Sequence, residues 1–330
     1  MAMRGLTRAV AAILAMIGAP ATPQVYQPTP HTRPPLLFDD VEPHTALALA
    51  DAGAQVERDR SPAWQLAEHR RLTSALATLQ PQRPGTVDAY VVAVGMDSDA
   101  VFGREAREAA AVLSRRYGAA GRTLLLAGTD GTADSQAPRG APDHLALALA
   151  RVAELMDLKE DVLVLYVTTH GAPFGLFYND GDAGAGAVSP TRLWTTLSQL
   201  GIENRLLILS ACFAGVFVPM LQSPTTAIVT AASADRTSFG CQADSDWTFF
   251  GDALINHALR KPQPLAAASA EAFGLIEAWE AEGKLKPSQP QLSIGSDVSR
   301  WLAPLDARMP RAATPPVGRP AVTILDELRR

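Results

Sequence analysis

The segment VLVLYVTTHGAPFG, which runs from Val162 to Gly175, decides the fold. Its first half is a run of Val, Leu and Tyr residues, which is typical of a parallel strand that is buried on both faces. The run ends in Thr-Thr-His-Gly, so the imidazole of His170 falls where the strand gives way to a loop. Functional groups of parallel sheets gather at the carboxyl ends of the strands. The segment therefore predicts a buried parallel strand and marks His170 as a candidate site residue.

Four other apolar runs share this strand pattern: TVDAYVVAVGM (86–96), RTLLLAG (122–128), NRLLILSACFAG (204–215) and TAIVTAAS (226–233). Helical patterns lie between and after them, over 104–117, 142–158, 190–200, 213–221 and 247–259. Strands and helices that alternate at this spacing indicate an α/β fold with a mostly parallel sheet.

The first residues of the chain have the pattern of a signal peptide. Arg4 and Arg8 form a positive start, an apolar run follows from Ala9 to Gly18, and Ala19-Pro20-Ala21 resembles a cleavage site. The apolar run is too short to span a bilayer, which takes about 20 residues. We therefore expect residues 1–21 to be removed and the protein to be exported, as a periplasmic or secreted protein, with no membrane span left after removal.

The rest of the chain divides by its proline content. Residues 22–84 are expected to be an extended, Pro-rich lead-in with one helix over 62–79. The alternating pattern that forms the main domain fills residues 85–303. Residues 304–330 contain MPRAATPPVGRPAV and are expected to be a loosely held tail.

Composition excludes several kinds of partner. The chain has 330 residues, 47% of them hydrophobic, so it can bury a large core. Its net charge of −5 gives no electrostatic footprint for nucleic acid.

No metal or cofactor is expected, because the histidines other than His170 lack the paired spacing of metal ligands. The acidic stretch NDGDAGAG (179–186) has an incomplete EF-hand spacing and is predicted to be a hairpin-like loop.

Cys212 ends the strand that follows the one carrying His170. Adjacent parallel strands would bring the two side chains to one sheet edge, as a nucleophile and its proton-transfer partner. A helix that starts near Phe213 would favour the thiolate, and Gly171 could add a backbone N–H donor. The alternative is that Cys212 is a small buried hydrophobe and His170 a satisfied loop residue. Cys241 could pair with Cys212 in a disulfide, or one of the two could be a working thiol; we expect only Cys212 to lie beside the imidazole.

Three segments resemble the legumain-like C13 family of cysteine peptidases: YVTTHGAPFG, LSACFAG and TAASADRTSFGCQADSDWTFFGDAL. They contain a His-Gly element, an Ala-Cys element and a later Gly-Asp element in the family's order, and the resemblance covers roughly residues 86–303. It implies a caspase-like α/β/α sandwich with a mostly parallel central sheet. It also implies a peptide or protein substrate.

The resemblance assigns roles to the catalytic residues. His170 would be the general acid and base, and Cys212 the nucleophile. The backbone N–H groups of Gly171 and Cys212 would donate to the oxyanion.

The same resemblance places Arg104 and its acidic partner Asp252 in the specificity pocket, and Thr237 and Ser238 along the substrate cleft. Two positions depart from the family. The acidic residue that asparagine-specific members carry two positions before the nucleophile is Ser210, a substrate-binding position in this chain. The asparagine that orients their histidine falls at Phe102.

These observations favour an exported cysteine endopeptidase that works through a Cys/His acyl-enzyme and cleaves after small polar residues. A transpeptidase could use the same thioester. A catalytically silent caspase-like binding module is a further alternative, and an unorganised histidine would be its signature. An α/β-hydrolase esterase is disfavoured because its nucleophile precedes its histidine, whereas His170 precedes Cys212.

Overall fold

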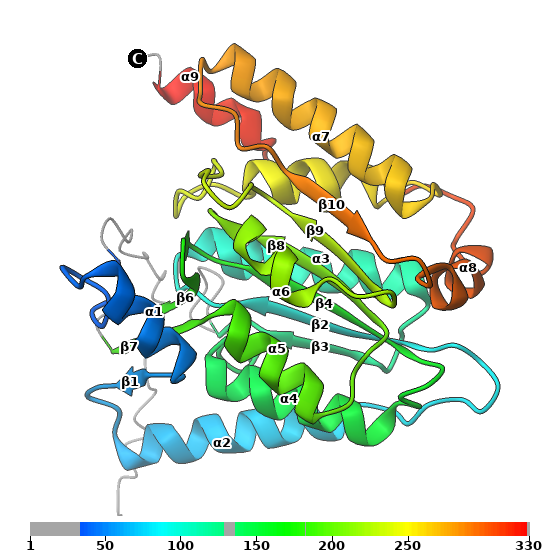
Figure 1. The fold of residues 1–330 in the computed structure, drawn as a ribbon, viewed down its shortest axis with the longest axis horizontal. Helices are drawn as coiled ribbons and strands as arrows, with labels where there is room; N and C mark the ends of the chain where they lie inside the picture. Colours follow the sequence, from blue (N-terminus) through cyan, green and yellow to red (C-terminus); the bar gives the residue numbers. More distant parts are fainter. Residues whose placement is uncertain (1–33, 129–135, 182, 329–330) are drawn as a thin grey trace, which may run out of the picture.

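The computed structural model describes residues 34–128, 136–181 and 183–328, and the predicted signal peptide lies outside them. Its centre is a six-stranded sheet in the order β10-β9-β8-β4-β2-β3 (Figure 1). The strands are β2 (Ala89–Gly95), β3 (Thr123–Leu126), β4 (Val162–Thr168), β8 (Arg205–Ser210), β9 (Thr226–Thr230) and β10 (Gln291–Ile294). Every neighbouring pair is parallel except β9 and β10. The predicted mostly parallel sheet is therefore confirmed.

Helices cover both faces of this sheet, which makes a three-layer sandwich (Figure 1). Alternate strand residues point to opposite faces, as a pleated strand requires: Val91 packs with the first helical layer and Val92 with the second. The first layer contains α3 (Ala100–Tyr117), the π-helix η2 (Gly251–Ala258) and α7 (Leu265–Glu282). The second layer contains α2 (Pro62–Ala77), α4 (Pro142–Leu155), α5 (Pro190–Gln199) and α6 (Val218–Leu221). The expected α/β/α sandwich is the observed architecture.

A small antiparallel sheet flanks the main one, in the order β1-β7-β6-β5. Its strands are β1 (Gln55–Glu57), β5 (Gly171–Ala172), β6 (Gly175–Asp180) and β7 (Gly184–Val188). The pairing of β6 with β7 shows that the acidic, Gly-rich stretch is a hairpin, as predicted. Phe38, Phe174 and Phe177 pack together beside this sheet and form a separate apolar cluster.

The prediction of an extended lead-in with one helix is wrong for residues 34–84. This part contains two helices, α1 (Pro43–Asp51) and α2, with strand β1 between them. Pro43 and Pro62 stand in the first turn of each helix, where a missing N–H costs no hydrogen bond. Proline therefore starts these helices instead of breaking the chain.

The prediction of a loosely held tail is also wrong. Beyond α8 (Ser299–Ala307) the chain crosses η2 and ends in η3 (Ala321–Thr323) and α9 (Ile324–Leu328). Ala321, Ile324 and Leu325 are buried in the same cluster as α3 and α7. Val317 accepts a hydrogen bond from the indole N–H of Trp247 (2.9 Å). Prolines keep this segment irregular, but its buried apolar residues hold it against the domain.

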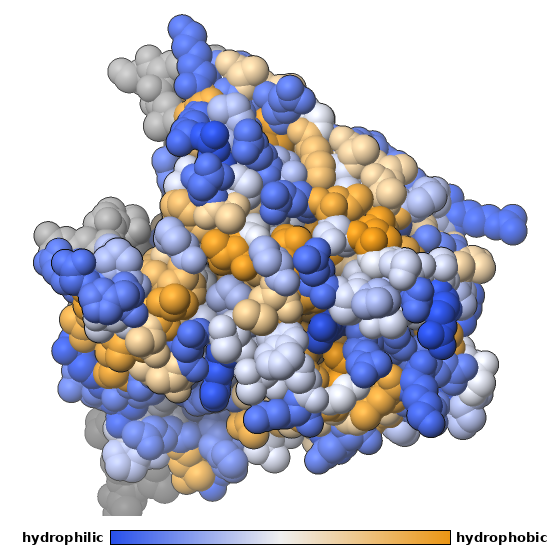
Figure 2. Space-filling view, in the orientation of Figure 1, coloured by the Kyte–Doolittle hydropathy of each residue, from blue (hydrophilic) through white to orange (hydrophobic). Residues whose placement is uncertain are grey.

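The surface in the view of Figure 2 mixes hydrophilic and hydrophobic residues, and the apolar ones form several separate groups. Within the described residues, no helix is both long and apolar enough to cross a membrane.

Candidate active site

Parallel pairing of β4 with β8 brings His170 and Cys212 to one edge of the sheet. Thr168 and Ser210 face each other in the register, and the Thr169 N–H donates to the Ser210 carbonyl (3.1 Å). His170 and Cys212 each lie two residues beyond that matched pair. The expectation that functional groups gather at the carboxyl ends of parallel strands therefore located both residues.

Gly171 packs against the backbone of Cys212. A Cβ atom on Gly171 would lie 2.2 Å from the Cys212 carbonyl oxygen, a distance that no real side chain tolerates. The loops that carry the imidazole and the thiol are thus in direct contact. Glycine at this position is a requirement of the close approach.

The segment that starts at Arg236 forms one wall beside Cys212. The Ser238 N–H donates to Cys212 Sγ (3.2 Å), and the Phe213 N–H donates to the Arg236 carbonyl (2.8 Å). Thr237, between them, is exposed. The structure therefore places Thr237 and Ser238 next to the thiol.

No regular helix starts behind Cys212, contrary to the sequence-based expectation. Phe213 has a left-handed backbone (φ 57°), and the chain continues as a 3-10 turn, Ala214–Phe217, before the four-residue α6. So short a helix contributes little dipole to stabilise a thiolate. Burial raises the pKa of Cys212 to about 11, and the charge of Cys241 also raises it.

His170 is held by an aromatic ring and a carboxylate. Phe102 meets the imidazole edge-on, with 4.9 Å between ring centroids. Asp99 Oδ2 lies 3.8 Å from His170 Nε2, and the Asp99 carboxylate is buried. The resemblance to the C13 peptidases puts Phe102 where they have an orienting asparagine, and the structure adds Asp99 as the acidic neighbour. Asp99 follows β2, the other neighbour of β4, so the expectation about strand ends could also have found it.

The imidazole is also close to the second cysteine. Burial lowers the pKa of His170, but the nearby Asp99 carboxylate and the Cys241 thiol outweigh it and raise the pKa to about 10. The expectation that only Cys212 lies beside the imidazole is therefore wrong. Cys212 and Cys241 are both free thiols in this structure.

Asp97, Asp99 and His170 offer ligand atoms within 4.8 Å of one another. A divalent cation could use such oxygen and nitrogen donors. In this structure Asp97 Oδ1 accepts the Asp99 N–H (2.8 Å) at the start of α3. The geometry is that of a carboxylate pair that supports the histidine.

The expected pairing of Arg104 with Asp252 is wrong. The Arg104 guanidinium donates to the carbonyls of Ala243 (2.7 Å) and Ser245, and its acidic neighbour is Asp246, at 3.6 Å. Asp252 lies fully buried in η2. Arg104 therefore holds the loop that follows Cys241.

Asp252 accepts hydrogen bonds from the Asn256 amide (2.8 Å) and from the Ala321 N–H (2.7 Å). Its carboxylate points toward the docked tail, so it anchors the tail to η2.

Ser210 is buried below the strand ends. Its hydroxyl donates to Glu105 Oε1 (2.9 Å) and lies 3.2 Å from the Thr248 hydroxyl. Glu105, next to Arg104 in α3, was not anticipated from the sequence. Position 210 carries no carboxylate of its own, but the Ser210 hydroxyl is hydrogen-bonded to the carboxylate of Glu105 in α3.

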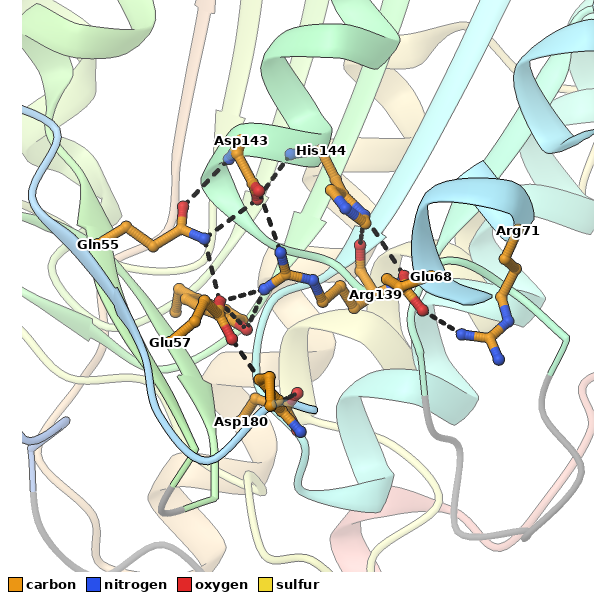
Figure 3. Close-up of polar contacts among 10 residues, drawn as sticks. Gln55, Glu57, Glu68, Arg71, Arg139, Asp143, His144 and Asp180 are labelled. Atoms are coloured by element: carbon orange, nitrogen blue, oxygen red, sulfur yellow. Dashed lines mark hydrogen bonds and ion pairs between the residues drawn. The ribbon is translucent and has the colours of Figure 1, made fainter. Parts of the chain in front are cut away.

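A second polar cluster joins the lead-in to the loop after β3 (Figure 3). Arg139 is its centre and contacts Glu57, Asp143 (3.0 Å) and the Tyr178 hydroxyl (2.8 Å). Positive and negative side chains alternate in this cluster and form ion pairs with one another. It therefore fixes β1 and α2 to the main domain.

A three-layer α/β sandwich with a cysteine and a histidine at adjacent strand ends is an arrangement that could serve nucleophilic thiol chemistry. Residues 143–276 match the model of the Peptidase C13 family. The matched segment, which is less than half of the chain, is similar to this family of cysteine peptidases. The matched part includes His170 and Cys212, whereas Asp99 and Arg104 precede it. A comparison with curated proteins gave no match.

Proposed function

We propose that the protein is an exported cysteine endopeptidase that forms a thioester on Cys212. The observation that carries the proposal is the contact between the two strand-end loops, in which Gly171 lies against the Cys212 carbonyl. Peptide cleavage by a thiol needs a nucleophile and a proton donor at one place. The class of the family agrees with that chemistry.

In the proposed reaction, the Cys212 thiol gives up its proton to water, and the thiolate attacks the peptide carbonyl carbon and forms a C–S bond. The N–H groups of Gly171 and Cys212 donate to the resulting oxyanion. His170, whose raised pKa of about 10 keeps it protonated at neutral pH, gives its proton to the leaving amine as the C–N bond breaks. The neutral imidazole then takes a proton from water, and the hydroxide releases the acid and restores the thiolate.

The proposed substrate preference is a small polar residue before the cleaved bond. Arg104 of α3 and Asp246 of the loop that follows Cys241 place opposite charges side by side. Such a pair suits a side chain that both donates and accepts hydrogen bonds. Ser210 presents no charge of its own, so discrimination for asparagine should be weaker than in a strict asparaginyl enzyme. Thr237 and Ser238 would line the cleft beside this residue.

Two alternatives use the same residues. A transpeptidase would resolve the thioester with an amine in place of water. A silent binding module should have an unorganised histidine, whereas His170 lies between Phe102 and Asp99. That arrangement favours an active enzyme.

Cleavage of a peptide library that is randomised on both sides of one fixed position tests the proposal. The protein from residue 22 onward should cut after small polar residues, and Cys212→Ala and His170→Ala should both remove cleavage while both variants unfold cooperatively. Cys241→Ala is the matched control and should retain cleavage. Equal cleavage by the parent and by Cys212→Ala would refute the proposal, and products joined to an added amine would identify transpeptidation.

A further inference from the structure

Glu105 is a fully buried carboxylate that the proposed reaction does not use. Such a group is costly to bury unless hydrogen bonds replace its water. Its Oε1 accepts from the hydroxyls of Tyr166 (2.5 Å), Thr168 (2.7 Å) and Ser210 (2.9 Å). Its Oε2 accepts from the Thr248 N–H (2.8 Å). The carboxylate thus has four donors from three separate parts of the chain.

Two of these donors have a particular relation to the catalytic pair. Thr168 ends β4 two residues before His170, and Ser210 ends β8 two residues before Cys212. The two face each other in the register, and one oxygen of Glu105 accepts from both hydroxyls. The carboxylate therefore joins the last residue of each strand that carries a reacting side chain.

The surroundings of Glu105 are built to admit it. A Cβ atom on Gly251 would lie 2.1 Å from Glu105 Oε2, so only glycine leaves room there. The Thr248 hydroxyl in turn accepts the Gly251 N–H (2.9 Å) and lies beside Ser210.

A buried charge of this kind seldom maximises stability, because apolar residues of similar volume often stabilise a fold as much or more. A positional role explains why a carboxylate occupies this place. A displacement of about 1 Å between reacting groups can cost on the order of 100-fold in rate.

We propose that Glu105 is a positioning residue that sets the spacing between the His170 imidazole and the Cys212 thiol. It does so by fixing the ends of β4 and β8 to each other and to Thr248. This inference rests on the proposed peptidase function, but it concerns the geometry of the two side chains and can be measured without a substrate.

The test compares Glu105→Gln with Asp161→Asn. Asp161 is also a fully buried carboxylate, and it accepts the backbone N–H groups of Asp88 (2.7 Å) and Asp157 (2.8 Å). It lies just before β4, at the end of the strand opposite to His170. Both variants lose one buried charge and keep their shape. Urea unfolding, kcat and KM for a cleaved peptide, and the rate of Cys212 alkylation by iodoacetamide are measured for each, with peptide mapping to locate the alkylated thiol.

Glu105→Gln should lower kcat at least tenfold, in keeping with the roughly 100-fold cost of a 1 Å displacement, with KM within about twofold of the parent. It should also change the alkylation rate of Cys212 at least threefold. Asp161→Asn should lower stability without either effect. Thr168→Val removes one bond and keeps the charge, so it should lower kcat by a smaller factor, and it replaces Glu105→Gln if that variant does not fold.

Unchanged kcat in folded Glu105→Gln or Thr168→Val, or equal losses in Glu105→Gln and Asp161→Asn, would overturn the proposal. If the parent cleaves no peptide, the peptidase function fails. The comparison of alkylation rates then still decides the role of Glu105: a change in Glu105→Gln alone supports it, and equal rates refute it.

Discussion

At the scale of single residues, the protonation states of His170 and Cys212 depend on burial and on neighbouring groups, Cys241 among them. Burial lowers the pKa of His170, whereas Asp99 and Cys241 raise it. Burial raises the pKa of Cys212, and Cys241 raises it further. At neutral pH the protein thus holds a protonated His170 imidazole, and Cys212 is a neutral thiol. Because the thiolate is the reactive form, reactivity should rise with pH.

Cys241→Ala should shift the pH profile of Cys212 alkylation toward lower pH. Its removal takes away a cause that raises the pKa of Cys212, so more thiolate is present at a given pH. Alkylation rates between pH 6 and about 11 give the profile, since thiol reactivity follows the thiolate fraction. Cys241→Ser controls for the lost volume. A shift toward higher pH would contradict this account of the two thiols.

Asp99→Asn should lower the pKa of His170, because the Asp99 carboxylate is the largest of the causes that raise it. The imidazole then loses its proton at lower pH, so a smaller fraction of it can protonate the leaving amine as the pH rises. We expect kcat to fall on the order of 10- to 100-fold, no more than the low end of the roughly 100- to 10,000-fold that general acid catalysis contributes, because the imidazole itself remains. The alkaline limb of the kcat profile should move to lower pH. An unmoved limb would show that Asp99 does not act on the imidazole.

At the scale of elements, the docked tail depends on Asp252. Asp252→Ala removes two hydrogen bonds from a fully buried carboxylate, to Asn256 and to Ala321. The free energy of unfolding should fall by about 2–3 kcal/mol, as hydrogen bonds to charged groups contribute about 1.5–3 kcal/mol. Urea unfolding measures this loss, and the library of the cleavage assay measures specificity. A changed cleavage preference with unchanged stability would return Asp252 to the substrate pocket.

The elements that sequence reasoning found are those with a strong local signal. β4 and β8 are continuous apolar runs that end in polar residues, so both their burial and the strand-end site could be predicted. β10 was missed because it is four residues long, lies at a sheet edge and is only partly buried. α7 was missed because its many alanines give a weak apolar period.

The contacts of Glu105 and Asp252 could not be predicted, for a different reason. Each joins residues from separate parts of the chain, as Glu105 joins β4 to β8. Side-chain partners of this kind depend on how helices pack on the sheet, and a local pattern does not carry that information.

At the scale of the whole molecule, export gives a direct prediction. Cleavage after Ala21 would leave Thr22 as the first residue of the mature protein. Expression of the full chain in a bacterium with a periplasm, followed by intact-mass measurement of the exported fraction, checks this. Arg8→Glu weakens the positive start of the segment and should hold the chain in the cytoplasm. An exported product that keeps residue 1 would contradict the cleavage.

The central claim is that Cys212 is the nucleophile and His170 its partner. A peptide that ends in an acyloxymethyl ketone after a small polar residue tests it most directly, because this group alkylates a thiolate held at the scissile position. Peptide mapping should find the adduct on Cys212 in the parent and in Cys241→Ala, with much slower labelling in His170→Ala. An adduct on Cys241, or labelling of Cys212 at the same rate without His170, would contradict the account.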